Sequence, residues 1–175
     1  LLAQDGWKAG NILRELVAKK GEKLKETPDL VIGKKKYKSD LIPPALIVAR
    51  YFPDQQAEVD RLQVEKDAAS QELESFVEEH SGEEGLIEDA KNDKGKVTKG
   101  TLKDRIKEIR DDPDFADELA VLKKCQKLLD AESAASTSVK DAQRKLDAAV
   151  FAKYPKLAID DIKALTVDDK WLADI

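Results

Sequence analysis

One histidine, His80, and one cysteine, Cys125, are the only imidazole and thiol that this 175-residue chain contains. Neither has a second histidine or cysteine near it in the sequence, as a zinc site or a nucleophile and base pair would require. His80 falls near the end of an expected helix, where an imidazole suits the helix dipole. We interpret Cys125 as a small core or flank residue and acidic pairs such as Glu78-Glu79 as a solvated face. We therefore expect no catalytic centre, cofactor site or metal site in this segment.

The stretch SDLIPPALIVARYF, residues 39–52, contains paired prolines and is the other candidate for chemistry. Adenine-N6 DNA methyltransferases use a loop in which Asn or Asp precedes two prolines and an aromatic residue follows, because the amine needs an acceptor and the flipped base a stacking ring. Here Ile42 precedes the prolines and Ala45 follows them, so both groups are missing. We expect Pro43 to end a strand and Pro44 to begin a short helix to Phe52.

A lysine run lies just before these prolines, in DLVIGKKKYKSDL. Alternation with a period of two and a glycine at the turn predicts a β-hairpin with one lysine-covered face. Such lysines can contact nucleic-acid phosphates, but solvated lysines on an edge strand also discourage aggregation. Tyr37 either packs inward or stacks on a base, and residues 12–18 fit a short helix or a strand. The four candidates for phosphate contacts are Lys34, Lys35, Lys36 and Lys38.

Composition limits the fold and the location of the protein. Charged residues make up 38% of the chain and aromatic residues only 5%, so the core must be mainly aliphatic, which suits thin helical packing. The absence of a long apolar run or an apolar leader predicts a cytoplasmic protein with no membrane partner. The lack of methionine and the Leu-Leu start suggest a piece of a longer polypeptide. Residues 1–53 carry 11 basic and 6 acidic side chains, whereas the remainder carries 20 and 30, so the two parts should have different partners.

Two long helices should follow Pro53. The first is expected to run about 27 residues, since its apolar positions are spaced alternately by three and four residues. Gly82 and Gly85 end it, and a linker with at most one helical turn leads to Gly100 and a short amphipathic helix. The seam positions of the first helix are Val59, Leu62, Lys66, Ala69, Leu73, Phe76 and His80.

The second long helix should begin at Asp112-Pro113, an N-cap acceptor followed by proline, and end at Pro155. Its continuity through the small residues 131–138 stays open. One or two short helices should follow, with Trp171 as their large anchor. The pattern predicts a mainly α fold: a long antiparallel helical hairpin, coiled-coil-like, with a small N-terminal part containing a β-hairpin. The second seam comprises Phe115, Leu119, Leu122, Gln126, Leu129, Val139, Ala142, Leu146, Ala149 or Val150, and Lys153.

Three blocks of this chain resemble the C-terminal third of modification (M) subunits of type I restriction-modification systems. They are DGW near the start, TPDLVIGKKKYKSDLIPPALIVARYF, and the ending AKYPKLAIDDIKALTVDDKWLADI. The resemblance implies a parent adenine-N6 DNA methyltransferase that uses S-adenosylmethionine. It also implies an assembly of two M subunits with one specificity (S) subunit, which reaches DNA and recruits restriction (R) subunits. The catalytic and cofactor motifs of the family lie upstream, so no such residue is carried over.

By this resemblance the helical segment docks the M subunit to helices of the S subunit. Residues 1–53 would end the methyltransferase domain, residues 54–155 form the hairpin, and residues 156–175 form a docking segment. Such tails often have Thr or Ser where Ala158 begins the last helix, so we expect that segment to be loose until a partner holds it. Two alternatives remain, a free-standing coiled-coil adaptor and a nucleic-acid-binding module using the lysine hairpin. Candidates for the internal seam or the docking surface, not separable here, are Val59, Leu62, Leu73, Phe76, Leu146, Val150 and Trp171.

Overall fold

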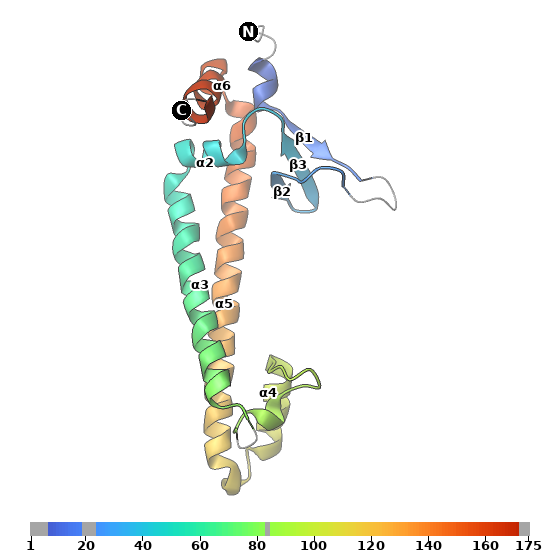
Figure 1. Cartoon of the computed structure of the whole chain (residues 1–175), viewed down its shortest axis with the longest axis vertical. Helices are drawn as coiled ribbons and strands as arrows, with labels where there is room; N and C mark the ends of the chain where they lie inside the picture. Colours follow the sequence, from blue (N-terminus) through green and yellow to red (C-terminus); the bar gives the residue numbers. More distant parts are fainter. Residues whose placement is uncertain (1–6, 19–23, 83–84, 172–175) are drawn as a thin grey trace. The chain divides into compact units, whose positions relative to one another are not determined.

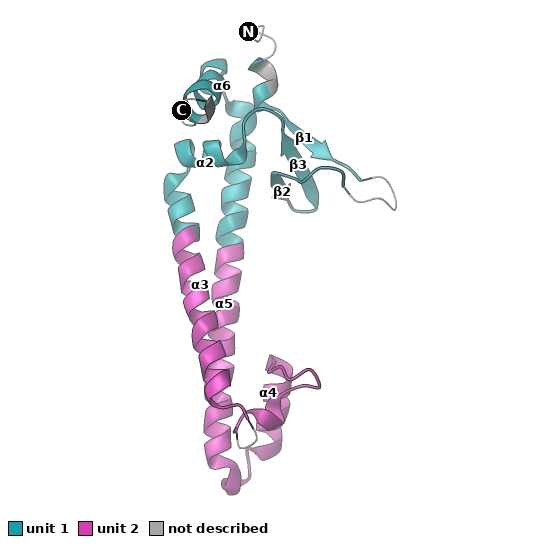
Figure 2. Cartoon of the chain, in the orientation of Figure 1, with its two compact units in different colours: residues 1–59, 141–175 teal, residues 60–140 magenta. Residues whose placement is uncertain are grey.

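The computed structural model describes residues 7–18, 24–82 and 85–171. The chain is mainly helical, with a three-stranded antiparallel sheet near its N-terminus (Figure 1). It divides into two compact units, here called unit 1 (residues 1–59 and 141–175) and unit 2 (residues 60–140) (Figure 2). The sequence predicted three segments with boundaries after residues 53 and 155, which differ from the boundaries of these units. That division remains a prediction.

The sheet belongs to unit 1 and contains the predicted hairpin. Strands β2 (Leu30–Ile32) and β3 (Lys35–Ser39) pair through a turn at Gly33, whose φ of 61° favours glycine. The segment left open between helix and strand forms β1 (Leu13–Leu16), which pairs with the other side of β3. Side chains alternate along β3, so Tyr37 faces the core with its cross-strand partner Leu30, while Lys36 and Lys38 share the other face.

The paired prolines follow this sheet and begin a helix. Helix α2 (Pro44–Tyr51) starts at Pro44, as predicted, and buries Ile47 completely. The predicted strand end at Pro43 is wrong, because β3 already ends at Ser39. Ser39 pairs with Leu13, the first residue of β1, so the ladder ends at this pair. Beyond it the Ser39 hydroxyl donates to the carbonyl oxygen of Ile42.

Two long helices form the antiparallel hairpin. Helix α3 (Pro53–Glu79) has the predicted 27 residues, and α5 (Ala116–Lys153) is continuous through residues 131–138. Its 38 residues run about 57 Å at 1.5 Å per residue. In unit 1 Val59 packs in one core cluster with Leu146 and Val150, and in unit 2 Phe76 packs with Leu122 and Cys125. The predicted hairpin is therefore confirmed, whereas Phe115, predicted as the first position of the second seam, is 38% exposed.

The connection between the long helices is part of the core of unit 2. After Gly82, with φ 117°, a 3₁₀ turn (Glu88–Ala90) leads to α4 (Lys99–Ile109), the predicted short helix. Ile87 and Leu102 are fully buried and anchor this connection against the cluster around Phe76. A second 3₁₀ turn (Pro113–Phe115), capped by the Asp112 carboxylate, then precedes α5. The predicted start of the long helix at Asp112-Pro113 is therefore wrong, because these residues begin the 3₁₀ turn and α5 begins at Ala116.

The last elements return to unit 1. A 3₁₀ turn (Tyr154–Lys156) and helix α6 (Ile159–Thr166) follow α5, and a π-helical turn (Val167–Trp171) ends the described chain. Ile162 and Leu165 anchor α6 in the core, whereas the side chain of Trp171 lies outside the described residues. Ala158 supplies no capping side chain, but the Asp161 carboxylate accepts its N–H at 3.0 Å, so half of a capping box is present.

Candidate interaction surfaces

Two of the four candidate lysines of the sheet are paired with acidic side chains of the chain itself. Lys35 Nζ lies 3.0 Å from Glu15 Oε2, and Lys38 Nζ lies 2.7 Å from Asp29 Oδ1. The bond to Glu15 raises the pKa of Lys35. Lys34 and Lys36 are exposed and have no acidic partner within the described ranges. Of the four candidates for phosphate contacts, two therefore keep an uncompensated charge.

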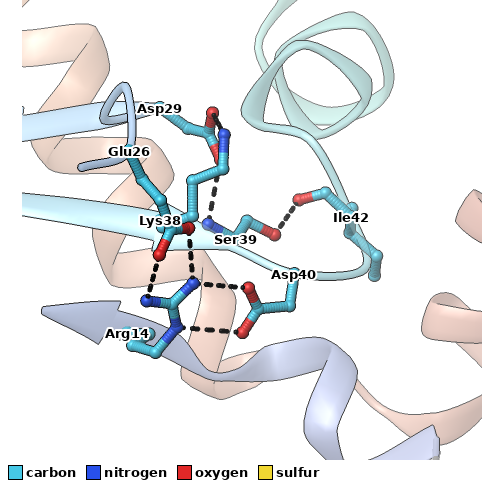
Figure 3. Close-up of polar contacts among 7 residues, drawn as sticks. All are labelled: Arg14, Glu26, Asp29, Lys38, Ser39, Asp40 and Ile42. Atoms are coloured by element: carbon cyan, nitrogen blue, oxygen red, sulfur yellow. Dashed lines mark hydrogen bonds and ion pairs between the residues drawn. The ribbon is translucent and has the colours of Figure 1, made fainter. Parts of the chain in front are cut away.

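Arg14 extends this charge pairing across the sheet (Figure 3). Its guanidinium makes two hydrogen bonds to Glu26, at 3.1 and 2.8 Å, and two to Asp40, at 3.0 and 3.3 Å. These bonds hold the pKa of both carboxyls below their usual values. Alternating charges of this kind stabilise the sheet locally and weaken its attraction for a polyanion.

The joint around the paired prolines is tied to the end of α5. The Tyr154 hydroxyl donates to the buried carbonyl oxygen of Ile42 at 2.6 Å, and the Ser39 hydroxyl donates to the same atom. Burial raises the pKa of Tyr154 to about 12. Tyr37 packs against Phe151 with ring centroids 4.9 Å apart, so it packs inward. These contacts support the structural interpretation of the stretch at residues 39–52.

A mostly apolar cavity of about 360 Å³ lies in unit 1 beside this joint. Asn11, Leu13, Tyr37, Phe151 and Tyr154 line it, together with neighbouring residues. Sequence reasoning missed this cavity, because its walls come from segments more than 100 positions apart. Only the pairing of β1 with β3 and the position of α5 bring them together.

The predicted seam residues lie mainly inside the protein. Phe76 and Val59 are each 7% exposed, and Leu146 and Val150 are more deeply buried. Leu62 and Leu73 are half-buried, and the side chain of Trp171 falls outside the described residues. Most of this set therefore packs within the chain, and a docking surface requires other side chains.

A groove between α3 and α5 in unit 2 is one such surface. It has a volume of about 490 Å³ and is floored by Phe76 and Leu128. Lys124 reaches over the Phe76 ring, with its ammonium 4.7 Å from the ring centroid. Glu72 and Glu79 stand on the α3 side of the groove and are exposed. The arrangement combines an apolar floor with charged walls.

His80 has a structural role next to this groove. Its ring stacks on Phe76 with centroids 4.3 Å apart, and its Nδ1 lies 3.0 Å from the Phe76 carbonyl oxygen. Cys125 is fully buried in the same unit, and burial raises the pKa of its thiol. A buried thiol with a raised pKa is a poor nucleophile. These positions agree with the structural interpretations of both residues.

The most buried charge pair joins α4 to α5. Arg105 donates to Glu118 through Nε at 2.6 Å and Nη2 at 3.1 Å, and Glu118 is 8% exposed. The same guanidinium also contacts Asp89 and Glu108. Sequence reasoning missed this pair, because Glu118 looks like any other acidic residue in the first turn of a helix.

Within residues 7–18, 24–82 and 85–171, no three His, Cys, Asp or Glu side chains come together as a metal site would need. Over the same part of the chain, no helix has the length and apolar character needed to cross a membrane.

Comparison with known proteins adds no identity. No family model, no curated protein and no solved structure matches the chain. Membership in the family that the three sequence blocks resemble therefore stays a prediction.

Proposed function

We propose that this chain is the C-terminal part of the M subunit of a type I restriction-modification system and that it docks this subunit to the S subunit. The parent chain would be a cytoplasmic DNA adenine-N6 methyltransferase using S-adenosylmethionine, with the reaction centre outside this segment. DNA, a second M subunit and R subunits would be reached through the full assembly.

One observation carries the proposal: the three blocks that resemble the family meet in a single core. Trp7 of the first block, Ile42 and Ile47 of the second and Ile162 of the third belong to the same cluster. The bond from Tyr154 to Ile42 joins the second block directly to the third. A family pattern spread over separate blocks, the last two about 100 residues apart, is expected where those blocks pack together in the fold.

The hairpin supports the docking part of the proposal. Its seam buries only a narrow stripe of each helix, which leaves long helical faces available to another protein. Residues 60–79 of α3 carry seven acidic and two basic side chains, a net charge of −5. Such a face favours protein contact over DNA, because it repels phosphates.

Co-expression tests the proposal. A tagged copy of this chain is produced with the S subunit from the same genome, and the complex is measured by size-exclusion chromatography with light scattering. We expect a stable complex with S and none with a similarly charged unrelated protein. Failure to bind S, while circular dichroism shows a helical chain, would refute the docking function and favour the coiled-coil adaptor. Duplex DNA binding that falls when Lys34 and Lys36 become Gln would favour the nucleic-acid module.

A further inference from the structure

Helix α3 has a second face that the seam does not use. Val64, Ala68 and Ser75 repeat at spacings of four and seven, so they lie on one side of the helix. Val64 is 68% exposed, and Ala68 and Ser75 are exposed at the wall of the groove described above. Small side chains along such a face allow another helix to approach closely.

The groove is charged as well as apolar. Glu72 and Glu79 flank it from α3, and Lys124, the cation at its α5 wall, is positioned over the Phe76 ring. The whole α3 segment of unit 2 adds a net charge of −5. A second copy of the same acidic face would be repelled, and so would a nucleic acid. A cationic partner is attracted.

From these features we infer that the groove lined by Ala68, Glu72, Ser75 and Glu79 receives a basic amphipathic helix. Its apolar side chains contact Phe76 and Leu128, and its Lys or Arg side chains pair with the two glutamates. The inference deepens the proposed function and rests on it, since the helix is assigned to the S subunit. It adds the binding face and the charge of the partner.

A pair of synthetic helices tests the chemistry without the S subunit. The probes are peptides of about 18 residues, roughly 27 Å long as helices, with a leucine face and either lysine or glutamate elsewhere. A third peptide has the lysine composition in scrambled order. Fluorescence anisotropy measures binding to the intact chain. We expect the lysine amphipathic peptide to bind, more weakly as salt rises, and the other two to bind at least about tenfold more weakly.

Charge-matched variants locate the site. Glu72→Gln with Glu79→Gln should weaken lysine-peptide binding about tenfold. The control, Asp67→Asn with Glu74→Gln, removes the same charge from the opposite side of α3 and should change binding less than about twofold. Equal effects of the two pairs, or equal binding of the glutamate peptide, would overturn the inference.

Ala68→Trp then connects the groove to the S subunit. The new ring fills an exposed wall of the groove, so the fold should persist, which circular dichroism checks. We expect this variant to lose S-subunit binding. If wild type and Ala68→Trp bind S equally, the inference fails and the proposed function stands. If wild type does not bind S but the lysine peptide still binds at the groove, the proposed function and the assignment to S fail, whereas the match to a basic helix stands.

Discussion

The buried carbonyl oxygen of Ile42 accepts hydrogen bonds from two hydroxyl groups, which allows a quantitative prediction about stability. Tyr154 comes from the end of α5 and Ser39 from the end of β3, and both donate to this one oxygen. Ile42 is 0% exposed, so water cannot easily replace a lost donor. The perturbations are Tyr154→Phe, Ser39→Ala and the two together. Phenylalanine keeps the ring in the core and removes only the hydroxyl.

The magnitude follows from what each variant leaves behind. Either single substitution removes one hydrogen bond and keeps the other, so each should cost about 1 kcal/mol. The double variant leaves a buried acceptor without a partner, which adds about 1–3 kcal/mol of desolvation. The free energies of unfolding should therefore be non-additive, with a coupling of at least about 1 kcal/mol.

Urea unfolding of the four proteins measures this coupling. Both tryptophans of the chain, Trp7 and Trp171, belong to unit 1, so fluorescence follows the unit that contains the mutations. Circular dichroism follows the helices of both units and controls for effects elsewhere. Costs that add within about 0.5 kcal/mol would refute the idea that the two hydroxyls satisfy one buried acceptor.

Three further predictions concern ionisable groups. Because burial raises the pKa of Tyr154 to about 12, above an unfolded value near 10, its stabilisation is complete below about pH 10 and is lost toward pH 12. Urea midpoints of Tyr154→Phe should fall less over this range than those of wild type. Hydrogen bonds from the Ala158 N–H and, second, from the Tyr51 hydroxyl lower the pKa of Asp161. The contribution of Asp161 to the free energy of unfolding is therefore present above about pH 4 and lost as pH falls. In Asp161→Asn the urea midpoint should therefore fall less below pH 4 than in wild type. Equal pH dependence of the two proteins would contradict a stabilising role for these hydrogen bonds. Glu118→Gln removes the most buried of the three carboxylates that contact the Arg105 guanidinium and should cost about 2 kcal/mol in thermal or urea unfolding. A loss below about 1 kcal/mol would show that the two remaining carboxylates or solvent compensate for its charge.

Periodicity predicted the long helices well for a physical reason. A helix that buries one stripe must repeat apolar residues every three or four positions, and α3 does so from Val59 to Phe76. The hairpin at Gly33 was equally visible, since alternation and a turn glycine are local signals. The strand end at Ser39 was missed, because it depends on the register of β1, whose first residue, Leu13, pairs with Ser39.

The candidate site was less predictable, because the same spacing describes a seam and an outer face. Val64, Ala68 and Ser75 repeat as regularly as the seam positions, and only the packing of α5 shows which stripe is covered. Likewise, the burial of Glu118 depends on α4 folding against α5, which no local pattern specifies. The ion pairs of Lys35 and Lys38 could not be predicted either, because they depend on which residues the folded chain places beside each lysine.

Unit 1 is built from two separated stretches of the chain, and this has a consequence for how the protein is made. Residues 1–59 leave the ribosome before unit 2, but the donor for Ile42 comes 112 positions later and the anchor Ile162 later still. Apolar side chains of residues 1–59 therefore lack part of their core while all of unit 2 is translated. Unit 2 has its own core and can fold during this interval. Synthesis of the last turns of α5 and of α6 is thus the step that closes the first part of the chain.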